Sequence, residues 1–304
     1  MSNKEKDILE ALKNKLIETA GISEDDFLSE NDECKTQNCI YYLRDLKDNL
    51  QKDQKNYSMH LENYSKKDTG RNRYNVIPMA ALRSSAALIY NILGDDDECE
   101  LNFEALSDSS IELNLISGKY QLQYEWKYKT ISRSRANIDA HLSNEENNCH
   151  LFIEMKMLEP LTKTHPFDSY SSYKNSSDCP DVFKDAFDYF VGKKLEYFDA
   201  CQMIKHLLAI YNYFKDNPPK ETQNVVLLNC HWEPLNHCVN GISLKDTYTA
   251  FDNFAKEFES MRDCFQEKLF AKLNVNLVLA HCTHSDLKKM VGKENDEYLK
   301  RYEI

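Results

Sequence analysis

Glycine and proline are scarce in this chain of 304 residues, with seven of each. Neither GxxxxGK[ST] nor GxGxxG occurs, which argues against the glycine-rich phosphate loops of nucleotide-binding proteins. No run approaches the roughly 18 apolar residues that a membrane helix needs. The N-terminus, MSNKEKDILEALKNKL, is charged from its start and lacks the apolar core of a signal peptide. These absences predict a protein without membrane contact, located in the cytoplasm.

Paired cysteines are also missing, although the chain holds ten cysteines. None forms the CxxC pair that a structural zinc site usually shows. Without a signal peptide, we expect reduced thiols rather than a disulfide framework. The Cys and His residues between positions 230 and 284 leave a zinc clip as an alternative. Two buried strands that end in Cys and His explain them more simply.

An excess of positive charge is absent too. The chain has 50 acidic and 38 basic residues, which gives a net charge of -12. This balance argues against a protein that coats nucleic acid through bulk positive charge, and it leaves a local basic groove open. The hydrophobic content of 41% and charged content of 29% are those of an ordinary globular protein.

The hydrophobic period changes along the chain from that of helices to that of strands. The spacing predicts helices over residues 4–20, 39–64, 76–94, 197–214 and 246–273. It predicts strands over residues 120–128, 136–142, 150–158, 223–232 and 275–282. A long surface loop is expected over 160–180. This order predicts an α/β protein with one central mixed sheet flanked by helices. We expect an N-terminal helical elaboration over 1–70 and the main domain over 71–304.

The segment NIDAHLSNEENNCHLFIEMKM, residues 137–157, places three charged side chains on two adjacent strands. Side chains alternate along a strand, so Glu154 and Lys156 share one face and the apolar Met155 takes the other. If the strands pair through the polar turn between them, Asp139 comes close to Glu154. Lys and Glu are poor strand formers, so their presence here needs a reason.

Two carboxylates beside an ammonium suit a magnesium site. Mg²⁺ takes oxygen ligands, usually one or two carboxylates together with waters and a substrate phosphate. We expect Asp139 and Glu154 to be ligands, with the backbone carbonyl of Met155 as an additional ligand. Mn²⁺ would serve in the same place. Lys156 is positioned to stabilise charge on a transferring phosphoryl group, or to help deprotonate and orient the attacking water.

The pattern D-x14-E-x-K on adjacent strands resembles the PD-(D/E)XK nuclease superfamily, in its restriction-endonuclease-like branch. The resemblance covers roughly residues 76–230. It includes the helix ending in RSSAALIYNILG, the strand YQLQYEWKY with its Tyr-Glu step, and the helix CQMIKHLLAIYN. By that resemblance Glu125 or Glu104 is the candidate third acid. Gln202 is a candidate site residue that steadies Lys156 or the water. The residue before Asp139 is Ile138, where the family motif has proline.

The resemblance implies a restriction-endonuclease-like core and a Mg²⁺-dependent endonuclease of the restriction or defence type, with DNA as substrate. Cleavage would leave a 3′-hydroxyl and a 5′-phosphate. Cutting both strands of a duplex needs two sites, so a homodimer is compatible with it. Lys129, Arg133 and Arg135 precede Asp139 and are candidates for holding the flanking phosphates.

Simpler interpretations exist for each of these groups. Asp139, Glu154 and Lys156 could form a surface salt bridge on a solvated face of the sheet. Glu125 could be a cross-strand partner of a lysine. The basic segment could be a plain charged loop, and Gln202 with its neighbours could lie on a solvated helix face. The alternative function is a nucleic-acid-binding protein on the same fold with little or no catalysis.

Overall fold

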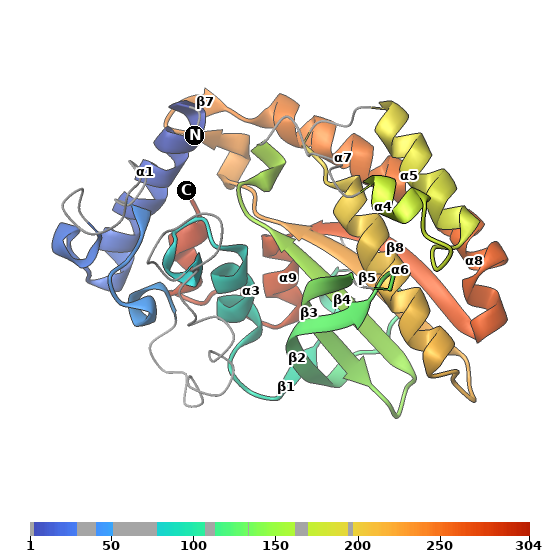
Figure 1. The fold of residues 1–304 in the computed structure, drawn as a ribbon. Coiled ribbons are helices and arrows are strands. Elements are labelled where there is room, and N and C mark those ends of the chain that lie inside the picture. Colours follow the sequence, from blue (N-terminus) through green and yellow to red (C-terminus); the bar gives the residue numbers. More distant parts are fainter. Residues whose placement is uncertain are drawn as a thin grey trace.

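A curled sheet lies between two layers of helices in the computed structural model of this protein (Figure 1). The structure describes residues 3–28, 41–50, 78–106, 113–132, 134–161, 170–193 and 197–304. No helix within these residues combines the length and the apolar character needed to span a membrane. The expectation of an α/β protein with a central mixed sheet flanked by helices is confirmed.

The sheet has six strands in the order β1-β2-β3-β4-β5-β8. Their bounds are β1 Glu98–Leu101, β2 Gly118–Lys129, β3 Arg135–Asn144, β4 Cys149–Lys156, β5 Gln223–His231 and β8 Val275–Thr283. The first four strands pair antiparallel, and β4, β5 and β8 pair parallel. A separate two-stranded ribbon joins β6 Cys238–Val239 to β7 Ile242–Ser243. The carboxyl ends of β4, β5 and β8 therefore meet at one edge, where α/β proteins commonly place their sites.

Helices cover both faces of the sheet (Figure 1). The α-helices are α1 Asn3–Ala20, α3 Ser85–Leu93, α4 Tyr170–Lys174, α5 Asp181–Lys193, α6 Ala200–Asp216, α7 Lys245–Glu259, α8 Arg262–Lys268 and α9 His284–Met290. One buried cluster joins the sheet to α1, α3 and α9, and a second joins it to α5, α6, α7 and α8. Ile153, Met155 and Met157 lie in the first cluster, as their alternation with Glu154 and Lys156 predicts.

Along β2 and along β3, the apolar side chains switch from one side of the sheet to the other. The two switches lie at neighbouring positions of the paired strands. In β2, Tyr124 packs on the α3 side, whereas Trp126 packs on the α6 side. Between them Glu125 has a φ of 53°, a left-handed conformation that is uncommon for a residue with a side chain. In β3, Ala140 packs on the α3 side and Ile138 on the α6 side. The change of face therefore falls at Glu125 in one strand and Asp139 in the other.

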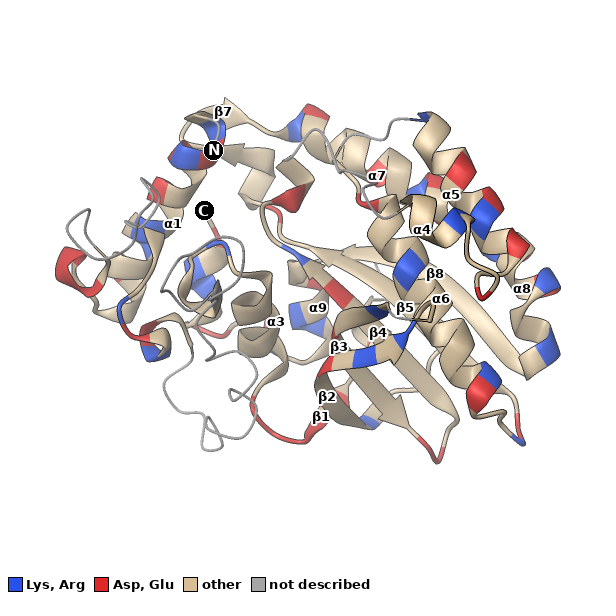
Figure 2. Ribbon diagram, viewed as in Figure 1, with Lys and Arg blue, Asp and Glu red and all other residues tan. Residues whose placement is uncertain are grey.

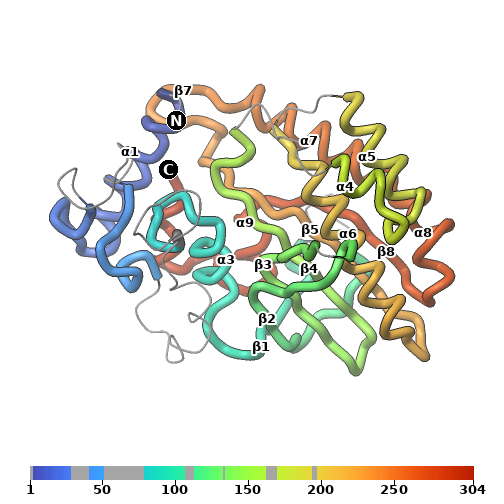
Figure 3. Tube along the Cα trace, in the orientation of Figure 1, coloured from blue at the N-terminus to red at the C-terminus, as the bar shows by residue number. Residues whose placement is uncertain are grey.

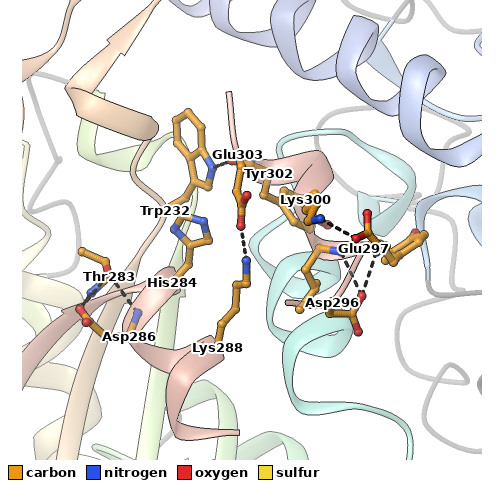
Figure 4. Close-up of polar contacts among 12 residues, drawn as sticks. Trp232, Thr283, His284, Asp286, Lys288, Asp296, Glu297, Lys300, Tyr302 and Glu303 are labelled. Atoms are coloured by element: carbon orange, nitrogen blue, oxygen red, sulfur yellow. Dashed lines mark hydrogen bonds and ion pairs between the residues drawn. The ribbon is translucent and has the colours of Figure 1, made fainter. Parts of the chain in front are cut away.

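The C-terminal residues pack against the α3 side of the sheet, and Figure 3 shows them close to α1. Trp232 Nε1 donates to the backbone carbonyl of Tyr302 at 2.9 Å. The ammonium of Lys288 in α9 pairs with Glu303, and Lys288 is only 3% exposed (Figure 4). This ion pair, in which the lysine is buried and the glutamate is partly exposed, lies on the opposite face from Glu154 and Lys156, so Lys288 offers a structural control for Lys156.

Some predicted elements differ from those observed. The helix expected over 39–64 is wrong in its described part, because residues 41–50 hold only isolated bridges and the short 3-10 helix Leu46–Asn49. The single helix expected over 246–273 is divided into α7, α8 and the 3-10 helix Phe270–Leu273. The segment expected as a loop over 160–180 contains α4, and its residues 162–169 lie outside the described part. Residues 51–77, which include the end of the expected N-terminal elaboration, also lie outside it.

Candidate active site

Asp139 lies where β3 separates from β4. The paired register of these strands ends at Ala140 and Ile153, so the next positions, Asp139 and Glu154, are not paired through their backbones. Instead, Asp139 Oδ2 accepts a hydrogen bond of 2.8 Å from the backbone N–H of Met155. A side chain thus takes the place of a strand partner, and β3 can diverge from β4 without leaving this donor unsatisfied. The divergence separates Asp139 from the sheet ladder.

Glu154 and Lys156 form a buried ion pair on the α6 side of β4. Lys156 Nζ lies 2.7 Å from Glu154 Oε1, and the side chains are 11% and 4% exposed. Gln202 of α6 contacts both: its Oε1 accepts from Lys156 Nζ at 2.5 Å, and its Nε2 donates to Glu154 Oε1 at 2.7 Å. This closed triangle fixes the ammonium in one position. The interpretation as a surface salt bridge is wrong for this pair, because both side chains are buried.

His206 also faces Glu154, from one turn further along α6. Its Nε2 lies 3.0 Å from Glu154 Oε2, and the residue is 2% exposed. The contact is close but poorly aligned, so Oε2 lacks a hydrogen bond from any described residue. The interpretation of His206 as part of a solvated helix face is therefore wrong. Its spacing of four residues from Gln202 was the signal that both side chains lie on one face of the helix.

The charges of the site shift the pKa values of its acids in opposite directions. Burial raises the pKa of Asp139 well above its ordinary value, and the negative charge of Glu154 raises it further. Burial would also raise the pKa of Glu154, but Lys156 and His206 outweigh it and lower that pKa to about 2. Burial lowers the pKa of Lys156, yet the neighbouring carboxylates, chiefly Glu154, raise it overall. Lys156 is therefore protonated at neutral pH, and the pair Glu154–Lys156 is charged.

Glu125 lies across from Asp139 on β2. Its neighbours Tyr124 and Trp126 pair with Ala140 and Ile138, which brackets this position. The Glu125 carboxylate accepts from the side chain of Asn137 and lies 3.5 Å from Lys127 Nζ. Its charge also contributes to the raised pKa of Asp139. The expected cross-strand pairing with a lysine is wrong in one respect: Lys127 lies on the same strand as Glu125, and the cross-strand contact is with Asn137. Glu125 also interacts with Asp139.

The basic residues expected beside the site differ in their surroundings. Lys129 Nζ pairs with Asp216 of α6 at 2.7 Å, and Arg135 is exposed at the start of β3. Arg133 lies outside the described residues. Lys and Arg occur along β2, β3 and α6 (Figure 2). Lys129, however, is held at Asp216, the last residue of α6, whereas Gln202 lies in the first turn of that helix. Arg135 is thus exposed, whereas the ammonium of Lys129 is held by Asp216.

A divalent cation fits the carboxylates of this site. Asp139 has a single hydrogen bond among the described residues, and the buried Oε2 of Glu154 has none. The mutual repulsion that raises the pKa of Asp139 is the kind that a bound cation relieves. Within the described part of the chain, no group of three or more His, Cys, Asp or Glu side chains is arranged to hold a metal. An ion held here would thus take further oxygen ligands from waters and a phosphate, as Mg²⁺ commonly does.

Comparison with known proteins does not add a relative to this description. No protein-family model matches the chain, and no curated protein or solved structure is significantly similar to it.

Proposed function

We propose that this protein is a metal-dependent nuclease that hydrolyses phosphodiester bonds, with DNA as the first substrate to test. The observation that carries the proposal is the position of Asp139 beside the buried triangle of Glu154, Lys156 and Gln202. Two acids and a fixed ammonium lie close together where two strands diverge. The acids can bind a cation, and the ammonium can contact a phosphate that is bound to the same cation. The sequence pattern D-x14-E-x-K resembles that of PD-(D/E)XK nucleases, which have a restriction-endonuclease-like core. This resemblance supports the same conclusion.

Each residue has a distinct role in this proposal. Asp139 and Glu154 would hold Mg²⁺ or Mn²⁺, with the Met155 carbonyl and Glu125 as further candidate ligands. The ion would polarise the scissile phosphate and lower the pKa of a bound water. Lys156, which stays protonated, stabilises negative charge on the phosphoryl group rather than accepting a proton.

Two residues of α6 support these groups. Gln202 holds the ammonium of Lys156 and the carboxylate of Glu154 in a fixed geometry. His206 faces the second oxygen of Glu154. Such supporting contacts fix the orientation of ligands and of charged groups around a reaction centre.

The alternative is a protein that binds nucleic acid on this fold without cutting it. The net charge of -12 favours it, and so does the buried triangle, since Glu154 is already paired with Lys156. An ion pair with a buried lysine also occurs at Lys288 and Glu303, and among the described residues Glu303 is the acid that pairs with Lys288. The feature that separates the two sites is thus Asp139.

A plasmid-nicking assay with Mg²⁺ or Mn²⁺ tests the proposal. We expect the wild-type protein to cleave and the variants Asp139→Asn and Lys156→Met to lose cleavage. Lys288→Met is the matched control, because it removes a buried lysine on the opposite face and should keep cleavage at temperatures where it stays folded. Absence of metal-dependent cleavage by the wild type on single-stranded DNA, duplex DNA and RNA would reject the nuclease and favour the binding protein.

A further inference from the structure

A pocket of about 300 Å³ opens next to the triangle, at the carboxyl ends of β4 and β5. Lys156 and Gln202 form one wall, so the pocket is continuous with the candidate active site. Phe251 of α7 and Tyr197, just before α6, also line it. Its volume is at the lower end of the roughly 300–1,000 Å³ typical of ligand pockets, which suits one ring system better than a polymer segment.

Asn229 of β5 is a buried polar residue that lines this pocket. It is 3% exposed, and its position in the sheet is directly beside Glu154. Its side-chain oxygen, Oδ1, is buried and has no hydrogen-bond partner among the described residues. A buried acceptor without a donor costs free energy, and such exceptions in a native structure call for an explanation. A ligand that supplies a donor inside the pocket would provide one.

The remaining walls are aromatic or acidic. Phe251, which is buried, and Tyr197 are the aromatic residues of the lining. Tyr197 has a φ of 66°, a left-handed conformation that is costly for an aromatic residue and that tends to occur at functional sites. Glu159 and Asp199 add carboxylates to the lining. The pocket thus combines flat apolar surface with hydrogen-bond acceptors.

We propose that this pocket binds a nucleobase that carries an exocyclic amine, with the amine donating to Asn229 Oδ1. The ring stacks between aromatic side chains, as bases do in single-stranded nucleic-acid sites. This inference rests on the proposed function, because the base would belong to a nucleotide whose phosphate lies at Asp139 and Lys156. The substrate is then a strand whose base is unpaired at the cleavage position, since a duplex cannot deliver a stacked base into a pocket.

The acceptors of the pocket discriminate among bases. Adenine and cytosine present an amine where thymine presents a carbonyl oxygen. A carbonyl placed against Asn229 Oδ1 would leave this buried acceptor unpaired and would set two acceptors against each other. Sites that require a hydrogen-bond partner reject analogues lacking it much more strongly than apolar pockets reject a change in size. We therefore expect deoxyadenosine and deoxycytidine to bind better than thymidine.

Titration of nucleosides followed by calorimetry tests the pocket separately from the phosphate site, because nucleosides carry no phosphate and need no metal. For the wild type we expect deoxyadenosine or deoxycytidine to bind about ten-fold or more tightly than thymidine, as one buried hydrogen bond implies. Asn229→Leu should abolish this preference. Tyr197→Asn, which removes the ring but tolerates the left-handed backbone, should weaken binding of both classes. Equal binding of thymidine, no binding of any nucleoside, or an unchanged preference in Asn229→Leu would overturn the inference.

Cleavage of short single-stranded oligo(dA), oligo(dC) and oligo(dT) with Mg²⁺ separates this inference from the proposed function. We expect faster cleavage of oligo(dA) or oligo(dC) than of oligo(dT) by the wild type, and similar rates for all in Asn229→Leu. Cleavage without base preference removes the pocket's role and keeps the nuclease. A nucleoside preference without cleavage of any substrate keeps the pocket and removes the nuclease.

Discussion

Asp139 accepts a hydrogen bond from the backbone of Met155, at 2.8 Å from Oδ2 to N, at the point where their two strands stop pairing. This single contact has two consequences. It supplies the Met155 donor with a partner, and it holds one carboxylate near a second one in a buried place. The site is therefore less stable with Asp139 ionised than with Asp139 neutral, and this instability can be measured.

Asp139→Asn should stabilise the protein at pH 7. The asparagine oxygen can still accept from Met155, while the repulsion from Glu154 is lost. We expect a gain of about 0.5–2 kcal/mol in the free energy of unfolding, measured by urea denaturation. Asp185→Asn, on the exposed face of α5, is the control and should change it by less than about 0.5 kcal/mol.

The pH dependence of this gain has a definite sign. A carboxyl group whose pKa is raised by folding binds its proton more tightly in the folded state, so its ionisation destabilises the fold as the pH rises. The advantage of Asp139→Asn over the wild type should therefore shrink as the pH falls from 7 toward the ordinary range of an aspartate. An advantage that grows toward acid would show that Asp139 is not the group under strain.

Removing one charge of the pair Glu154–Lys156 should lower the free energy of unfolding far more than removing both charges together. Glu154→Gln or Lys156→Met alone leaves a buried charge without its partner, which typically costs about 3–5 kcal/mol. The double variant Glu154→Gln/Lys156→Met should be less destabilised than the sum of the single variants. Thermal unfolding of the four proteins gives the coupling energy, and additive effects would indicate that the two charges do not interact in the folded state.

Acid should weaken the wild-type protein through Glu154. Its pKa is lowered from 4.5 to about 2, so the stability it contributes is complete above about 4.5 and is lost as the pH falls toward 2. Glu154→Gln lacks this titrating group and should show a flatter dependence in that window. Urea midpoints compared at several pH values between these limits measure the difference. Equal slopes would mean that Glu154 keeps an ordinary pKa.

Gln202→Ala should reduce the rate of cleavage without weakening substrate binding. Gln202 fixes Lys156 and Glu154, so its loss leaves the charges present but poorly oriented. Removal of such a supporting residue typically costs about 10- to 100-fold in activity. We expect the loss in kcat with little change in KM. Gln121→Ala is the matched control, because the Gln121 amide donates to the exposed Glu98 across the strands, and it should keep both constants.

The sheet was predictable because its strands are marked by a period of two residues. Glu154 and Lys156 share a face by alternation alone, and the short turn before β4 brings Asp139 near them. The triangle with Gln202 depends in addition on the position of α6 against β4, which strand alternation does not give. His206 was misjudged because a polar residue next to a lysine resembles a solvated face, and only the packing of α6 shows that it is buried.

Other features depend on contacts that a local pattern does not contain. The break between α7 and α8 follows residues that favour a helix, so it is set by packing rather than by propensity. Strand β1, Glu98–Leu101, is short and acidic, and pairing with β2 creates it. The pocket at Asn229 combines residues from four separate parts of the chain, 156–160, 197–202, 229 and 251. No spacing in the sequence indicates that combination.

The closeness of Glu154 and Lys156 along the chain also affects how the protein is made. Chain segments are synthesised in order, and α6 follows β4 by more than forty residues, as their bounds Ala200–Asp216 and Cys149–Lys156 show. The two charges can neutralise each other within the newly made strand, because no distant loop has to close first. When α6 later covers them, it covers a pair of zero net charge. Before α6 is made, Glu154 and Lys156 of β4 therefore pair with each other, and neither stands as an isolated charge on the face that α6 later covers.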